Sequence, residues 1–172
     1  MLLTILAGAL AVFAQSTVAR PDRISPRLAE QVRHELVMMP FYGVFDHVSF
    51  KLQGRKVVLL GDVSRPTLKD EAERRVKSLE GVEGVDNRIN VLPLSPYDDR
   101  IRLASYRAIY SNPGLNRYAW GPLPQIHLIV RNGTLTLKGR VDNEADRNLA
   151  GILATGVPGV FEVKNQLIVQ RG

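Results

Sequence analysis

The chain of 172 residues contains no cysteine. A disulfide framework, a lipid-modified cysteine and thiol chemistry are therefore excluded. Histidine is rare as well, with His34, His47 and His127 dispersed along the chain, and no two of them are spaced as a pair of metal ligands. Because a metal or catalytic site needs several convergent groups, the sequence predicts no metal site and no cofactor.

Sequence patterns typical of enzymes are missing too. Asp98 and Asp99 are neighbours, but adjacent residues of a helix point about 100° apart, so their carboxylates do not face each other. Acidic residues at this place suit the positive end of a helix instead. The stretch from Gly81 to Gly84 follows a predicted helix, whereas a phosphate-binding loop precedes one. The sequence therefore indicates a non-enzymatic protein without catalytic residues.

The uncharged apolar run at the start of the chain predicts export. Residues 1–15 carry no charge and contain Val12-x-Ala14, a small-residue pattern that resembles a signal peptidase site. We expect a signal peptide over residues 1–14, cleaved near Ala14, a linker over residues 15–25, and a location in the periplasm or cell envelope. The run is shorter than the about 20 residues of a membrane span. A retained anchor and a packed N-terminal helix are the alternatives.

Residues 57–91 and 139–169 are two copies of one pattern of apolar, glycine and asparagine positions. A shift of 78 positions superposes nine pairs of identical residues without a gap: Leu59 and Leu137, Gly61 and Gly139, Val63 and Val141, Ala72 and Ala150, Gly81 and Gly159, Val82 and Val160, Val85 and Val163, Asn87 and Asn165, Val91 and Val169. Self-similarity at one period means that the same supersecondary unit is built twice.

We therefore expect two small tandem domains, residues 26–92 and 98–170, joined by a short, stiff linker over residues 93–97. A unit of about 60 residues buries only about 60% of the surface of its unfolded chain. Each unit is therefore expected to gain stability by packing against the other.

The first unit is predicted to run helix, strand, strand, helix, strand. Apolar residues at helical spacing from Leu28 to Leu36 indicate a helix that ends before Pro40. Residues 44–52 alternate and lead through a turn into residues 57–63, which predicts a hairpin. An amphipathic helix then begins at residues 64–67 and ends at Gly81, and residues 85–92 form the last strand.

The second unit repeats this order, with helices over residues 98–110 and 144–155 and a last strand over residues 160–169. Its hairpin, residues 126–130 and 135–141, surrounds Asn132-Gly133, a strong local hairpin signal. The units differ most between the first helix and the first strand, where the second unit has five additional residues.

This doubled pattern resembles the BON domain, a family named for bacterial osmotically inducible and nodulation proteins. The match rests on Gly-x-Val, Ala, and Gly-Val-x-x-Val-x-Asn, each present twice. The resemblance implies an α+β fold with two tandem small αββαβ domains, each a three-stranded mixed sheet with two helices packed on one face. It also implies a cell-envelope location, attachment to phospholipid membranes and no catalytic residues.

Six positions of the pattern are expected to be structural: Gly61, Gly81, Asn87, Gly139, Gly159 and Asn165. The first glycine of each unit is interpreted as the end of a strand that turns closely onto a helix, and the second as a helix C-cap with positive φ. The asparagine is expected to bond local backbone where the last strand begins.

The candidate membrane or partner surface combines the predicted helix 98–110 with the insertion that follows it: Arg100, Leu103, Arg107, Tyr110, Arg117, Tyr118 and Trp120. Arginine mixed with tyrosine and leucine suits the headgroup region of an anionic bilayer. Trp120 is the one tryptophan of the chain and suits an interfacial anchor. The alternative is that Tyr106, Tyr110 and Trp120 pack between the two domains.

The charge balance favours an anionic phospholipid surface as the partner of the second unit, and the resemblance implies a role in envelope or osmotic stress maintenance. Residues 95–172 hold 10 basic and 6 acidic side chains, whereas residues 24–94 hold 11 and 10. The apolar segment 38–45 is expected at the domain interface, with a protein groove as the alternative.

The alternative function is a protein interaction module of an envelope assembly, which binds its partner by a sheet edge or the apolar loops. Nucleic acid is disfavoured as a partner, because the net charge of +6 is modest and the basic residues are dispersed.

Overall fold

The computed structural model describes residues 26–121 and 123–170, so the expected signal peptide and its linker lie outside the described residues. The first unit consists of α1 (Pro26–Val37), β1 (His47–Gln53), β2 (Lys56–Val63), α2 (Pro66–Lys77) and β3 (Gly84–Val91). The second consists of α3 (Pro96–Tyr110), a 3-10 turn η1 (Asn116–Ala119), β4 (Ile126–Arg131), β5 (Thr134–Val141), α4 (Glu144–Thr155), β6 (Glu162–Asn165) and β7 (Ile168–Val169).

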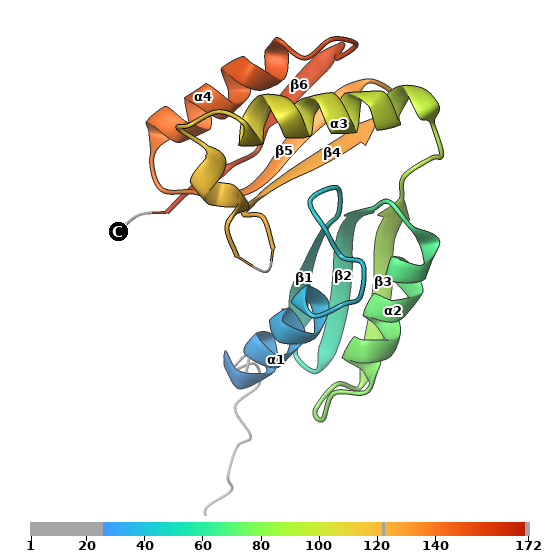
Figure 1. Cartoon of the computed structure of the whole chain (residues 1–172). Helices are drawn as coiled ribbons and strands as arrows, with labels where there is room; N and C mark the ends of the chain where they lie inside the picture. The colour runs from blue at the N-terminus through green and yellow to red at the C-terminus, as the bar shows by residue number, and fades with distance from the viewer. Residues whose placement is uncertain (1–25, 122, 171–172) are drawn as a thin grey trace, which may run out of the picture.

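Each unit has its own sheet, and the two sheets are separate (Figure 1). The first has the order β1-β2-β3, in which β1 is antiparallel and β3 parallel to β2. The second has the order β4-β5-β6, and β7 also pairs with β5. The expected α+β fold of two tandem units with mixed sheets is therefore confirmed.

The second sheet counts four strands where three were expected, because its last strand is interrupted. Leu137 pairs with Asn165 and Arg140 pairs with Ile168, so β6 and β7 continue one register along β5. Lys56 and Gly84 pair at the same separation in the first unit. β6 and β7 are thus two parts of the strand that corresponds to β3.

The helices of each unit pack on one face of its sheet and bury a separate core (Figure 1). The first core is built from α1, α2 and the inner face of β2 and β3, with Val32, Leu59, Leu68, Val76 and Ile89. The second contains the corresponding positions of α3, α4, β4 and β5, with Ile101, Ile109, Leu128, Leu135 and Leu137. Burial of these apolar side chains is the main favourable term in folding.

Gly61 and Gly139 do not end their strands, contrary to the sequence interpretation. Each lies inside its strand with positive φ, +128° and +116°, where a Cβ would overlap the carbonyl oxygen of His47 or Gln125 on the neighbouring segment. The glycine therefore permits a close approach of two backbones, a role for which only a residue without Cβ is suited.

Gly81 and Gly159 also have positive φ, +91° and +87°. They do not cap their helices, however, because the C-caps are Ser78 and Gly156, both in the right-handed region. The two glycines instead form the turn that leads from the helix to the last strand.

Asn87 and Asn165 connect the last strand of each unit to its second helix. Their side-chain amides donate to the carbonyls of Lys69, at 2.9 Å, and Arg147, at 2.7 Å. Their Oδ1 atoms accept the backbone N–H two residues further along, at 3.2 and 3.3 Å. The bonds thus reach beyond the local backbone expected from the sequence.

Candidate functional site

The outer side of α3 carries the exposed part of the candidate surface. Ser95 caps the helix by accepting the N–H of Asp98 at 3.2 Å, and Pro96 occupies the first turn, where its missing N–H is no disadvantage. The helix buries Ile101, among others, against the sheet. Arg100, Leu103 and Arg107 are exposed, and 53% of the Leu103 surface is accessible.

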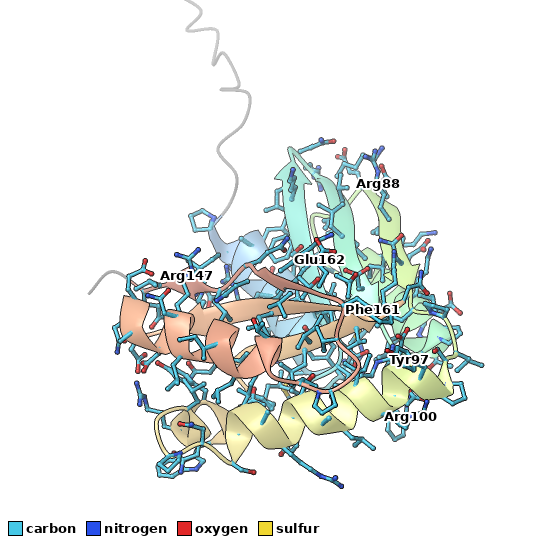
Figure 2. The ribbon with its side chains drawn as sticks, turned by 90° about the horizontal axis from the view of Figure 1, so that it is seen from above. Arg88, Tyr97, Arg100, Arg147, Phe161 and Glu162 are labelled. Carbon is cyan, nitrogen blue, oxygen red and sulfur yellow. The ribbon has the colours of Figure 1, made fainter. Side chains whose placement is uncertain are left out.

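Arg100 lies beside Tyr97 near the start of α3 (Figure 2), with its guanidinium 5.7 Å from the ring centroid. Asp99 adds an acidic group at this end, but it pairs with the buried Arg102. The outer side of α3 therefore presents Arg100 and Arg107 without a free acidic neighbour on the helix.

Trp120 extends this surface beyond the end of α3. The residue follows η1, and 72% of its side chain is exposed. Arg117 is also partly exposed but is not available as a free cation. Its guanidinium pairs with Asp142 at 3.3 Å and with Asp146, and lies over the Tyr118 ring.

Tyr110 and Tyr118 are buried and therefore do not belong to an exposed surface, as the sequence suggested. Tyr110 is 8% exposed, donates its hydroxyl to the carbonyl of Ile126, and has a pKa that burial raises. Tyr118 is 1% exposed; it donates to Asp146 at 2.6 Å and accepts the N–H of Asp142 at 2.9 Å. Tyr118 itself belongs to η1, which contacts α3.

A second feature, the joint between the two units, was missed at the sequence level. Leu128 at the free edge of β4 donates its N–H to the carbonyl of Val44 at 2.8 Å. The side chain of His127 lies 3.3 Å from the carbonyl of Gly43. Its ring centroid is 5.3 Å from that of His47. The loop before β1 therefore pairs with β4 and brings the two histidines together.

The joint also contains an acidic group between two basic ones. Asp62 of β2 pairs with Arg131 at 2.9 Å and with Lys138 at 3.5 Å, both from the second unit. Burial lowers the pKa of His47 to about 4, with further lowering by His127 and Lys138. Burial also lowers the pKa of His127. The two imidazoles are thus neutral at neutral pH.

The segment 38–45 is only partly in this interface. Val44 and Phe45 pack against the core of the second unit, and the Phe45 ring lies 6.5 Å from that of Tyr106 on α3. Met38 and Phe41 remain 58% and 76% exposed. Tyr106 therefore contacts the first unit, as the packing alternative proposed, whereas Trp120 is exposed.

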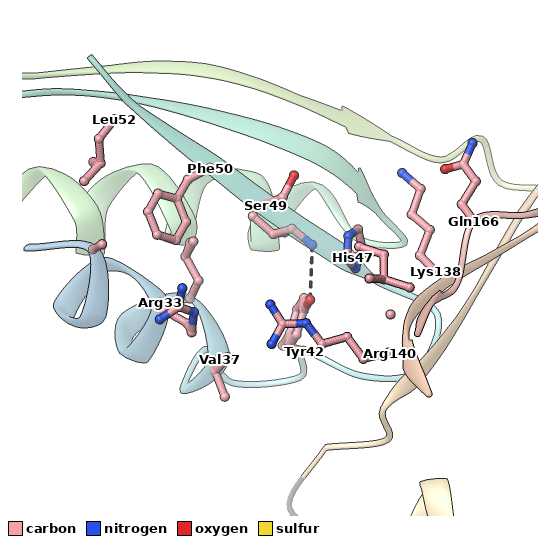
Figure 3. A pocket seen from close by; sticks show the side chains of 15 residues that line it. Arg33, Val37, Tyr42, His47, Ser49, Phe50, Leu52, Lys138, Arg140 and Gln166 are labelled. Atoms are coloured by element: carbon pink, nitrogen blue, oxygen red, sulfur yellow. Dashed lines mark hydrogen bonds between the residues drawn. The ribbon is translucent and has the colours of Figure 1, made fainter. Parts of the chain in front are cut away.

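A groove with a cavity volume of about 620 Å³ lies between the first unit and the end of the second (Figure 3). Its walls come from α1 and β1 on one side and from β5 and the segment around β7 on the other. We call it the β1 groove. Its lining combines apolar side chains such as Phe50 and Leu52, the basic Arg33, Lys138 and Arg140, and the uncharged polar Tyr42, His47, Ser49 and Gln166.

The described residues contain neither a group of metal-binding side chains nor a helix that could cross a membrane. In the ranges 26–121 and 123–170, no three His, Cys, Asp or Glu side chains are grouped so that they could hold a metal ion. In the same ranges, each helix is too short or too polar to cross a bilayer.

Comparison of the sequence with models of known protein families matches one family. The family model of the BON domain matches residues 26–93 and, a second time, residues 98–171. No curated protein matches. Among solved structures, the C-terminal domain of CdsD, a structural protein of the type III secretion system of Chlamydia trachomatis, is 15% identical over 87% of this chain and 100% of that chain, with a TM-score of 0.29. A second CdsD structure is 16% identical over 85% and 93%, with the same TM-score of 0.29.

Proposed function

The chain belongs to the BON domain family, with one domain at residues 26–93 and another at 98–171, and from this premise we propose that it is a non-enzymatic cell-envelope protein whose second domain binds anionic phospholipid membranes. Binding uses the outer side of α3 and the exposed tryptophan that follows it. The role that fits such a protein is maintenance of the envelope, including under osmotic stress.

The observation that supports this proposal is the combination of Arg100, Leu103 and Arg107 on one exposed side of α3, followed by the exposed Trp120. Arginine is attracted to anionic headgroups, while leucine and tryptophan enter the boundary between headgroups and acyl chains. Each basic residue near an anionic surface contributes about 1 kcal/mol. Two arginines therefore give weak binding that depends on lipid charge and on salt.

The helix of the first domain that corresponds to α3 does not offer an equivalent surface. The exposed side of its helix α1 mixes both signs of charge, and Arg33 lies 3.9 Å from Glu30. A mixed surface gains little from an anionic bilayer, because attraction of the basic groups is offset by repulsion of the acidic ones. The second domain is therefore the membrane-binding one in this proposal.

Co-sedimentation with vesicles tests the proposal. The full chain should sediment with vesicles of phosphatidylcholine and phosphatidylglycerol, but not with vesicles of phosphatidylcholine alone. The variant Arg100→Glu/Arg107→Glu should lose most binding, and Trp120→Ala should weaken it. Lys77→Glu, on the exposed side of α2, reverses one charge away from the α3 surface. This control variant should keep most of the vesicle binding. Equal sedimentation with both vesicle types, or no effect of the α3 changes, would contradict the proposal.

A further inference from the structure

The strand β1 forms one edge of the first sheet, because the strand order is β1-β2-β3. Its backbone on that edge is not used within the sheet. The N–H of Val48 donates to the Tyr42 hydroxyl at 3.1 Å, the dashed bond in Figure 3, and not to β2. In an antiparallel pair alternate residues face away from the partner strand, so the N–H and C=O groups of Phe50 and Leu52 face outward as well.

The β1 groove lies along this edge. Its volume of about 620 Å³ is within the range of pockets that bind ligands, about 300 to 1,000 Å³. Helix α1 forms one wall, and Arg140 and Lys138 reach in from β5 of the second domain (Figure 3). The groove is therefore complete only when both domains are present in their observed arrangement.

The charge of the groove has one sign. Among the described residues that line it, Arg33, Lys138 and Arg140 are basic and none is Asp or Glu. Two carboxylates outside the lining compensate part of this charge: Asp62 lies 3.5 Å from Lys138 and Glu30 lies 3.9 Å from Arg33. The remaining lining is partly apolar, with Phe50 and Leu52, and partly uncharged polar, with Ser49 and Gln166. An occupant that fits is anionic on one side and apolar on the other.

We propose that the β1 groove binds an extended acidic peptide segment of a partner protein, which adds to β1 as a further strand. An extended peptide satisfies the outward N–H and C=O groups of β1, which a fatty acid or a lipid headgroup leaves unpaired. Side chains of a strand alternate, so the peptide directs acidic residues to Arg33 and Arg140 and apolar residues to the wall of the groove.

The test uses a library of random short peptides, selected for binding to the full chain and then measured by fluorescence anisotropy. The enriched peptides should combine acidic and apolar residues. The variant Arg33→Glu/Arg140→Glu should weaken their binding about tenfold or more. Lys51→Glu, an exposed residue of β1 outside the groove, is the control and should leave binding unchanged. Circular dichroism and thermal unfolding establish that each variant is folded.

Hydrogen exchange identifies the mode of binding. Addition of a selected peptide should protect the amides of Phe50 and Leu52, and peptides with N-methyl groups on alternate backbone nitrogens should bind much more weakly. The proposal is overturned by selected peptides without acidic residues, by equal binding to the Arg33→Glu/Arg140→Glu variant, or by displacement of the peptide by decanoate without protection of β1.

Failure of the peptide proposal can be distinguished from failure of the membrane proposal, because the two use different residues. Arg33 and Arg140 do not belong to the outer side of α3, so their reversal should leave vesicle binding intact. The reversal of Arg100 and Arg107 should in turn leave peptide binding intact.

Discussion

His47 and His127 are 80 positions apart in the sequence, yet their ring centroids lie 5.3 Å apart where the two BON domains meet. Asp62 and Lys138 face the same place from β2 and β5 and are 3.5 Å apart. Neither histidine can be protonated here without bringing positive charge close to Lys138 or to the other ring. Burial, His127 and Lys138 therefore disfavour a proton on His47, whereas Asp62 favours one.

Acidification should destabilise the folded protein through His47. Its pKa falls from 6.5 to about 4 on folding, mainly because of burial. Above pH 6.5 the ring is mainly neutral in both the folded and the unfolded chain, so His47 does not reduce the free energy of unfolding there. Between 6.5 and 4 the unfolded chain binds a proton that the folded chain does not, so the free energy of unfolding decreases as pH falls. At about 1.4 kcal/mol per pKa unit, the total loss approaches about 3 kcal/mol.

Urea denaturation between pH 7 and pH 4 measures this loss. The variant His47→Gln cannot titrate at this position, so its free energy of unfolding should decline less than that of the wild type. His34→Gln, on the exposed side of α1, should decline in parallel with the wild type. A His47→Gln curve parallel to the wild type would show that the joint does not sense pH.

Substitution of Gly61 or Gly139 by alanine should destabilise the protein by about 2 to 4 kcal/mol, because positive φ and overlap with a neighbouring carbonyl act together. Thermal unfolding measures the effect. Gly84→Ala, a glycine in β3 whose Cβ would meet only the Cγ of Lys56, at 3.9 Å, is the matched control. A loss at Gly61 no larger than at Gly84 would contradict the close-approach role.

The sequence predicted the fold well because its signals are local and occur twice. The helices, the hairpin around Asn132-Gly133 and the last strands follow from periodicity and turn residues within each unit. The role of Gly61 could not be found in this way. Its conformation is required by the carbonyl of His47 on another strand, which is a tertiary contact.

The candidate surface was predicted less completely for a similar reason. Helical periodicity places Tyr110 near Leu103, but the ring of Tyr110 is buried and its hydroxyl donates to the carbonyl of Ile126, beyond the end of α3. The pairing of His47 with His127 depends on how the two domains meet. A pattern within one unit contains no information on such a contact.

Tyr118→Phe should destabilise the second domain by about 1 to 3 kcal/mol, because removal of the hydroxyl leaves the N–H of Asp142 and a carboxylate oxygen of Asp146 without this partner. Denaturant unfolding measures the difference. Tyr106→Phe removes a hydroxyl from a ring that is 40% exposed and should change stability little. Equal values for the two variants would show that the buried hydroxyl contributes nothing specific.

Asp62 and Lys138 should move the pKa of His47 in opposite directions. The positive charge of Lys138 lowers this pKa and the negative charge of Asp62 raises it. Asp62→Asn should therefore lower the pKa of His47 below its value of about 4, and Lys138→Met should raise it. Titration of the imidazole resonances by NMR measures both shifts. Asp62 is the partner of His47 within the first sheet, so its effect does not depend on the second domain. The effect of Lys138→Met does require that the two domains hold these groups close together in solution; if that variant left the His47 titration unchanged, the domains would not meet at this joint.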